Sequence, residues 1–188
     1  MGHEIDLLKN YPRAKRDLSK RAADKTEADR QIARKFGKDF FDGDRRHGYG
    51  GFTYNSKFWN PVVPVFQKHF GLTSNDKILD VGCAKGFMLH DFSRLIPGIS
   101  VSGIDVSDYA IKNSLADVKP FLSVADAKDL PFSDNEFNIA ISINTVHNLE
   151  LDDCVKALQE IERVSKGGSF ITVDAYRDDD EKQRMMAW

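Results

Sequence analysis

The stretch ILDVGCAKGFMLHDF, from Ile78 to Phe92, sets the fold that this sequence predicts. It begins as a short apolar run, breaks into a loop of small residues and continues with helical periodicity, so it predicts a buried strand, a tight turn and a helix. Loops at such turns hold the phosphates of a dinucleotide, the phosphates of ATP, or a ligand that has no phosphate. The choice among these ligands rests on the residues in and beyond the loop.

From Lys77 to Tyr176, short apolar segments alternate with amphipathic ones. The expected strands cover residues 77–82, 100–106, 120–126, 137–144 and 169–176. The expected helices cover residues 87–96 and 107–115 and a segment marked by Val155, Leu158, Ile161 and Val164. Strands that alternate with helices in this way predict an α/β fold, here a Rossmann-like, doubly wound and mainly parallel sheet with helices on both faces.

The chain divides by composition into two parts. We expect residues 1–56 to form an N-terminal helical extension with a lid rich in glycine and aromatic residues, and residues 57–188 to form the sheet domain. In the first part, a capping box at Thr26 begins a predicted helix. Residues 42–59 are expected to be an irregular loop, followed by a short helix over 61–70. The apolar residues of the first helix recur every four positions: Ala28, Ile32, Phe36 and Phe40.

The composition excludes several classes of protein. The 188 residues carry a formal net charge of −2 and are 41% hydrophobic, which favours a cytoplasmic enzyme or binding protein over one that binds nucleic acid or membranes. No apolar run approaches the roughly 20 residues that span a bilayer. Cys83 and Cys154 lie too far apart for a paired zinc or disulfide motif, so no metal is expected. The basic residues between 9 and 25 indicate a solvated helix face or a mobile leader, or alternatively an anion-binding arm.

The loop after the first strand lacks the features of a phosphate site. A P-loop ends in Gly-Lys-Ser/Thr, which GCAKGF does not contain, and a dinucleotide loop needs glycines where Ala84 and Phe87 stand. Asp80 lies two residues before Gly82, where its charge would repel a pyrophosphate. The carboxylate instead suits a cationic ligand, and Gly82 and Gly86 let the backbone approach that ligand closely.

Acidic and polar residues also follow the other strands, at the edge where parallel α/β sheets bind ligands. Asp105, nineteen residues beyond Gly86, has the spacing of a carboxylate that accepts hydrogen bonds from ribose hydroxyl groups. A nucleoside with an ammonium-bearing tail is S-adenosylmethionine. The residues that follow the remaining strands are Asp126, Ala127, Asn144, His147, Asp174 and Tyr176.

Four segments together resemble the successive motifs of class I S-adenosylmethionine-dependent methyltransferases. They are ILDVGCAKG, VSGIDVS, VADAKDLPFSDNEFNIAISINTVHNL and ALQEIERVSKGGSFITVDAY, and the resemblance covers roughly residues 57 to 176. It implies a Rossmann-like methyltransferase domain that takes S-adenosyl-L-methionine as its cofactor.

The resemblance also implies which residues bind the cofactor. The loop that wraps the methionine portion is matched by Asp80, Gly82, Cys83, Ala84 and Gly86. Asp105 is implied to hold the ribose hydroxyl groups, with Val106 against the adenine ring. Asp126 and Ala127 are implied to contact the adenine edge, and Asn144 to border the sulfonium. Ala84 departs from the family pattern, which often has glycine there.

Five residues outside these roles are candidates for substrate contact or catalysis. Tyr49, in the lid segment RRHGYGGFTY, is hypothesised to close over the cofactor, and His47 beside it to meet the substrate. His147 follows the fourth strand, where it is a candidate base or substrate ligand and otherwise caps or packs the next helix. Asp174 and Tyr176 end the predicted fifth strand and are candidate substrate contacts.

Methyl transfer from a sulfonium requires alignment of the nucleophile with the methyl carbon more than it requires a conspicuous catalytic residue. The sequence therefore predicts methyl transfer to a small-molecule acceptor, with two alternatives. One is a module that binds the cofactor and regulates or scaffolds without catalysis. The other is methylation of RNA or protein, which the acidic balance disfavours, as does SINTVHNL in place of an amine-methylation motif.

The C-terminal segment RDDDEKQRMMAW predicts one short helix, whereas the fold that the sequence resembles adds two more strands after the fifth. We therefore expect the last elements to be missing from this chain, a truncation that Met185, Met186 and Trp188 favour. The alternative is that another subunit of a homo-oligomer covers the exposed edge of the sheet.

Overall fold

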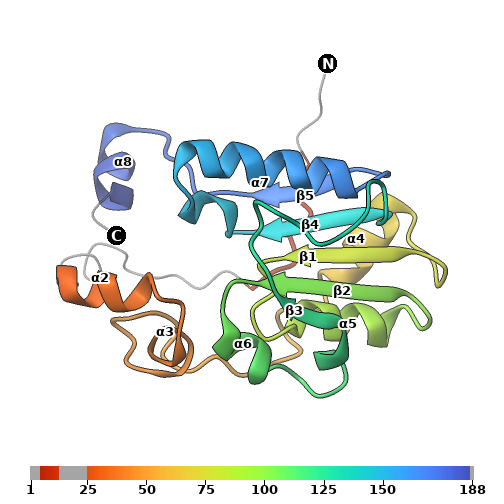
Figure 1. Ribbon diagram of the computed structural model, residues 1–188, viewed down its shortest axis with the longest axis horizontal. Helices are drawn as coiled ribbons and strands as arrows, with labels where there is room; N and C mark the ends of the chain where they lie inside the picture. The colour runs from red at the N-terminus through yellow and green to blue at the C-terminus, as the bar shows by residue number, and fades with distance from the viewer. Residues whose placement is uncertain (1–4, 13–24, 187–188) are drawn as a thin grey trace.

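The computed structural model describes residues 5–12 and 25–186 (Figure 1). Its centre is a five-stranded parallel sheet in the order β3-β2-β1-β4-β5, which confirms the predicted Rossmann-like α/β class. The order reverses between β1 and β4, so the loops that leave these two strands separate and leave space for a ligand. The strands are β1 (Lys77–Val81), β2 (Ser100–Asp105), β3 (Leu122–Val124), β4 (Ile139–Ile143) and β5 (Ser169–Thr172).

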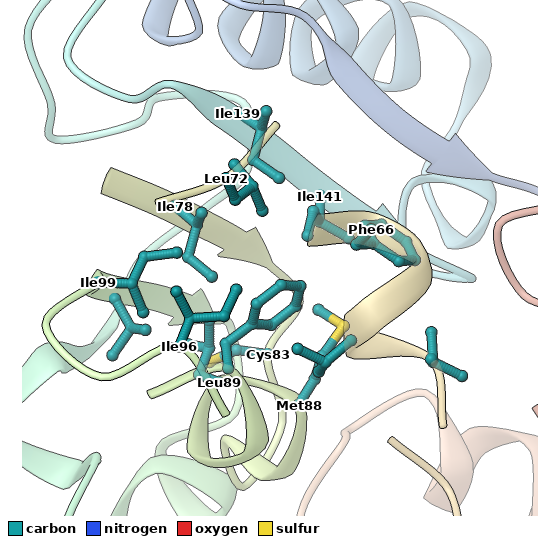
Figure 2. Close-up of a cluster of buried hydrophobic side chains, with 14 of the residues drawn as sticks. Phe66, Leu72, Ile78, Cys83, Met88, Leu89, Ile96, Ile99, Ile139 and Ile141 are labelled. Carbon is teal, nitrogen blue, oxygen red and sulfur yellow. The ribbon is translucent and has the colours of Figure 1, made fainter. Parts of the chain in front are cut away.

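Two helices cover one face of the sheet and one long helix covers the other. α4 (Val63–Phe70) and α5 (Phe87–Leu95) pack on the first face, where Ile78, Ile139 and Ile141 meet Phe66 and Leu89 (Figure 2). Successive residues of a strand point to opposite faces. Leu79, next to Ile78, therefore contributes to the second core cluster, which α7 (Leu151–Val164) covers with its buried residues Ala157, Ile161 and Val164.

Two strands are shorter than the sequence predicts. β3 begins at Leu122 because residues Lys119–Phe121 form a 3-10 turn, η1. β5 ends at Thr172, whose partner across the ladder is Ile143, the last residue of β4, because the next residue, Asn144, has a left-handed backbone that turns the chain out of the strand. The predicted strand over 169–176 was wrong in its second half, and Asp174 lies beyond the sheet.

The predicted first helix begins as expected but is two helices. The Thr26 hydroxyl accepts the Asp29 N–H at 3.2 Å and the Asp29 carboxylate accepts the Thr26 N–H at 2.9 Å, which confirms the capping box of α2 (Glu27–Ala33). The single-helix prediction was wrong because Phe36 has a left-handed backbone, φ 46°, which no helix continues through. After this break α3 (Lys38–Asp42) begins.

The other segments match the sequence prediction more closely. The stretch after α3 is irregular up to the start of α4, and Gly71 ends α4 with φ 65°. α6 (Asp108–Lys112) follows β2 and is shorter than expected, and η2 (Val146–Asn148) follows β4. The C-terminal segment contains the one expected helix, α8 (Asp179–Met186). Residues 13–24 of the basic segment and Trp188 lie outside the described residues.

The strand arrows in Figure 1 point toward α2 and α3, so the N-terminal helices lie at the carboxyl ends of the strands. The hydroxyl group of Ser107, just after β2, donates a hydrogen bond to the Phe36 carbonyl and holds the α2–α3 turn there. Within the ranges described, no helix combines the length and apolarity that crossing a bilayer would need.

Candidate functional site

Two cavities open at the carboxyl ends of the strands. The first, which we call the Phe40 cavity, has a volume of about 310 Å³ and lies among the residues that follow β2, β3 and β4. The second, the Trp59 cavity, has a volume of about 500 Å³ and lies beside β1 and the irregular lid loop. Both volumes are in the range of ligand pockets. The two cavities share a wall made of Tyr49, Gly82, Ala84, Ile143 and Asn144, so they lie side by side, and we call the pair the cleft.

The loop after β1 is built from left-handed backbone. Gly82 has φ 88° and Gly86 has φ 75°, and Ala84 between them has φ 49°, a conformation that costs a residue with a Cβ more than it costs glycine. A Cβ at position 82 would lie 2.1 Å from the hydroxyl oxygen of Thr145. A Cβ at position 86 would lie 2.8 Å from the side chain of Leu122. Both glycines are therefore required by close packing as well as by backbone conformation.

Asp105, at the end of β2, fixes the shape of this loop. Its two carboxylate oxygens accept the N–H groups of Ala84 and Ser107, each at 2.8 Å. Burial raises the pKa of Asp105, although these two hydrogen bonds oppose the shift. Each oxygen keeps a second lone pair, and the residue lines the Phe40 cavity. The carboxylate can therefore accept two further hydrogen bonds from a ligand.

Asp80 lines the Trp59 cavity and is 5% exposed. Among the residues that the structure describes, none donates a hydrogen bond to its carboxylate. Burial and then the charge of Asp105 raise the pKa of Asp80 to about 8. Cys83 lines the same cavity, and burial likewise raises the pKa of its thiol well above the usual value. A buried carboxylate without a donor favours a cationic ligand, because that ligand would supply the missing counter-charge.

The residues predicted for the adenine side line the Phe40 cavity. Val106, Asp126 and Ala127 all contribute to its wall. Val106 is 62% exposed, as an apolar residue at the mouth of a pocket would be. The Asp126 carboxylate accepts the N–H of Lys128 at 3.0 Å through Oδ1, and its Oδ2 lies 3.5 Å from the Lys128 ammonium group. The side chain is half-exposed, so Oδ2 keeps room for a ligand amine beside Lys128.

Asn144 stands at the junction of the two cavities. It has a left-handed backbone, φ 52°, and its side-chain oxygen accepts a hydrogen bond from the Thr172 hydroxyl group at 3.0 Å. Its own N–H donates to the Thr172 carbonyl at 3.0 Å. These bonds to β5 hold Asn144 in a conformation that asparagine tolerates better than most residues.

Aromatic residues from the N-terminal part complete the Phe40 cavity, and sequence reasoning missed most of them. Tyr49, the predicted lid residue, lines both cavities and packs its ring 4.3 Å from that of Phe52, centroid to centroid. Phe36, Phe40 and Phe41 line the Phe40 cavity beside it. The sequence pattern placed Phe36 and Phe40 on a helix face, and only the glycine after Phe36 indicated that the helix would break there.

The lid is tied to the β1 loop by Lys85, a residue that the sequence did not single out. Its ammonium group donates to the Asp42 carboxylate at 2.6 Å and to the Phe52 carbonyl at 2.8 Å, and the residue is 6% exposed. Asp42 also accepts the Tyr109 hydroxyl group at 2.8 Å and the Phe52 N–H at 2.9 Å. Although burial opposes the shift, these donors lower the pKa of Asp42.

The four remaining candidates do not line either cavity. His47 lies 3.1 Å from the carboxylate of Asp29, on the side of α2. His147 lies 3.6 Å from the Asp174 carboxylate through Nε2, and its Nδ1 is buried with no hydrogen-bond partner in the described part of the chain. Asp174 and Tyr176 are about half-exposed beyond β5, with Lys182 above the Tyr176 ring.

Comparison with known proteins assigns this chain to a family. Residues 79–173 match the model of the methyltransferase domain, which is half of the chain. This chain is a class I S-adenosylmethionine-dependent methyltransferase domain. The match begins in β1 and runs past β5, so it covers every strand of the sheet.

Individual relatives are more distant. A tRNA (carboxymethyluridine(34)-5-O)-methyltransferase from Arabidopsis thaliana is 33% identical over 67% of this chain and 30% of its own length. The mitochondrial arginine-hydroxylase NDUFAF5 of Mus musculus is 32% identical over 50% of this chain and 27% of its own. The crystal structure of MccD protein superposes with a TM-score of 0.53 and 28% identity, covering 62% of this chain and 54% of that one. The chain thus spans less than a third of the length of both curated relatives.

The family's cofactor is S-adenosylmethionine, and the residues of the cleft fit it. A carboxylate with free lone pairs at Asp105 suits a ribose diol, and the apolar wall of the Phe40 cavity suits an adenine ring. Asp80 is a buried carboxyl group next to the loop, and a cationic tail there would favour its ionised form and pair with it. The cleft therefore offers an apolar slot, a hydrogen-bond acceptor and a carboxyl group for the three parts of this cofactor.

Proposed function

We propose that this chain transfers a methyl group from S-adenosylmethionine to a small-molecule acceptor. The observation that carries the proposal is the pair of adjacent cavities, of about 310 and 500 Å³, which share Ala84 and Asn144 in their common wall. When bound, the cofactor would supply a methyl carbon on a sulfonium, so that an acceptor atom bonds to this carbon in line while the carbon–sulfur bond breaks and the neutral thioether leaves. The larger cavity is the place from which an acceptor can approach.

The chain's own residues bind and orient the cofactor rather than activate it. In this proposal Asp105 receives the ribose hydroxyl groups, and Asp126 receives the adenine amine. Asp80 opposes the positive charge of the tail, and Asn144 borders the reacting sulfur. Tyr49, which lines both cavities, has the role of the lid that excludes water from them.

The relatives' names state different substrates, so the acceptor class is inferred from the lining of the Trp59 cavity. Among the residues that the structure describes, the Trp59 cavity is lined mainly by apolar and aromatic ones, and Arg45 is the one basic residue. A nucleic-acid site would carry several basic side chains for the phosphates. These features favour a small acceptor held in the cavity, while the tRNA relative makes RNA the alternative to test.

Calorimetric titration with S-adenosylmethionine and S-adenosylhomocysteine tests the cofactor site. We expect both to bind, and Asp105→Ala to weaken binding at least about tenfold, since it removes two charge-assisted hydrogen bonds. Asp108→Ala is the matched control, because Asp108 lies just beyond the cleft and pairs with Lys112 on the surface. Binding of NAD in place of both ligands would contradict the proposal.

Mass spectrometry of small-molecule and RNA mixtures incubated with the cofactor then tests transfer. A gain of one methyl group in a small molecule supports the proposal. Methylation confined to RNA would contradict the acceptor class. Tight binding of S-adenosylmethionine without transfer of its methyl group to any acceptor would support a regulatory or scaffold module instead.

A further inference from the structure

The Trp59 cavity is lined by six aromatic rings in two groups. The first group comes from the N-terminal segment and the loop before α4, and the second from the lid and the start of α5. The rings within each group contact one another. The first group is Tyr11, Phe58 and Trp59, and the second is Tyr49, Phe52 and Phe87.

The geometry within the groups is that of packed aromatic pairs. The Tyr11 ring lies 5.4 Å from Phe58 and 5.0 Å from Trp59, and the Phe52 ring lies 4.8 Å from Phe87 at an interplanar angle of 24°. Aromatic pairs prefer offset-stacked and edge-to-face arrangements at such distances. All of these rings except Phe87 keep part of their surface exposed, so they line a hollow and do not fill the core.

Charged groups contribute little to this wall. Within residues 5–12 and 25–186, the charged residues that line the cavity are Arg45 and Asp80. Arg45 donates to the carbonyl oxygens of Gly48 and Tyr49, so its guanidinium serves the lid backbone. Asp80 belongs to the cofactor loop. The uncharged polar side chains of the lining include Thr53 and Asn55, which the cofactor roles proposed above do not use.

We propose that the Trp59 cavity binds a planar aromatic ring of the methyl acceptor, an inference that rests on the methyl-transfer function proposed above. Rings on the cavity wall stack on a flat ring or meet its edge, which a saturated ring of equal size cannot reproduce. Thr53 and Asn55 supply hydrogen bonds to a polar substituent on that ring. The cavity therefore selects for flatness as well as for apolar surface.

Trp59 reports directly on this site. The chain has two tryptophans, so Trp188→Phe leaves Trp59 as the single tryptophan. This variant is first saturated with S-adenosylhomocysteine, which keeps the probe out of the Phe40 cavity. It is then titrated with 2-naphthol and with decahydro-2-naphthol, the saturated alcohol of the same skeleton, by fluorescence and calorimetry. We expect 2-naphthol to quench Trp59 and to bind roughly tenfold tighter than the saturated alcohol.

Other outcomes overturn the inference or narrow it. Equal affinities for 2-naphthol and decahydro-2-naphthol would overturn a site for flat rings. The same holds if 2-naphthol does not quench Trp59, or if choline binds more tightly than 2-naphthol. A ten-nucleotide oligouridylate that quenches Trp59 and binds tighter than 2-naphthol would support the flat-ring site but assign it to a nucleobase, against the small-molecule acceptor. Failure of S-adenosylhomocysteine to bind would overturn the proposed function separately.

Phe58→Leu removes a ring while keeping an apolar side chain, and Phe121→Leu is the matched control because Phe121 is 55% exposed and outside both cavities. In the Trp188→Phe background, Phe58→Leu should weaken 2-naphthol binding roughly three- to tenfold. It should change the S-adenosylhomocysteine affinity less than the 2-naphthol affinity, because Phe58 lines only the cavity that receives the tail and not the Phe40 cavity that receives the nucleoside. Equal effects of the two substitutions would overturn the inference.

Discussion

Asp42 and Asp80 are two carboxylates beside the same β1 loop, and their surroundings are opposite. Asp42 accepts hydrogen bonds from Lys85, Tyr109 and the Phe52 backbone, and its pKa is lowered. Asp80 is more deeply buried, receives no hydrogen bond from any described residue, and has its pKa raised to about 8. The first carboxylate is satisfied within the protein, so it stabilises the lid. The second is left for a ligand, so it costs the free protein stability.

The largest effect is expected from breaking the satisfied pair. Lys85→Met removes the ammonium group and leaves Asp42 with two donors in a largely buried setting, so the free energy of unfolding should fall by about 3 kcal/mol. Urea denaturation measures this change. The control is Lys112→Met, which removes an exposed ion pair with Asp108 and should cost less than about 0.5 kcal/mol. Similar losses for the two variants would show that the Lys85 contact stabilises no more than a surface pair.

The unsatisfied carboxylate should respond in the opposite way. Asp80→Asn removes a charge that opposes burial, so at pH 8.5 the free protein should be no less stable than the wild type. The same change removes the counter-charge for the cofactor tail and should weaken S-adenosylmethionine binding roughly ten- to hundredfold. Asp42→Asn, measured in parallel, should lose stability. If Asp80→Asn lost stability as well, the contrast between the two carboxylates would fail.

The pH dependence of stability should sharpen the contrast. An unfolded aspartate has a pKa of about 3.9, whereas Asp80 in the folded protein has a pKa of about 8. The native state therefore binds more protons between these values, and this residue lowers the free energy of unfolding as pH rises from about 4 to 8. Between pH 5 and 6.5 the wild type should lose about 2 kcal/mol more than Asp80→Asn. Urea denaturation of both proteins at both pH values measures this difference. An equal change in the free energy of unfolding for the two proteins would refute the prediction.

The sheet was predictable from sequence because its strands are short apolar runs between amphipathic helices. The same rule placed Asp80, Asp105, Asp126 and Asn144 at strand ends, and the structure brings all four to one cleft. Parallel strands end at one edge, so a local pattern was enough to gather residues that are distant in sequence.

The remaining parts of the site depend on contacts that no local pattern encodes. Lys85 and Asp42 are 43 residues apart and meet through side chains, with no periodicity that links them. Phe36 and Phe40 fit a helical stripe, but the left-handed residue between the two helices turns them toward the Phe40 cavity. The fifth strand was predicted too long because its apolar pattern continues beyond the last residue of β4 that can pair with it.

The contact between Gly82 and Thr145 also determines where the cleft can be redesigned. A side chain at position 82 is excluded twice, by the left-handed backbone and by the Thr145 hydroxyl group 2.1 Å from its Cβ position. In a library of variants, position 82 should therefore retain glycine even when the residue at 145 shrinks. Position 145 has no left-handed backbone, so only packing restricts its side chain. The Thr145 hydroxyl group donates a hydrogen bond to the Ile143 carbonyl, and a substitution that removes the hydroxyl loses that bond. Reshaping the junction of the two cavities by selection would begin from Thr145→Ser or Thr145→Ala.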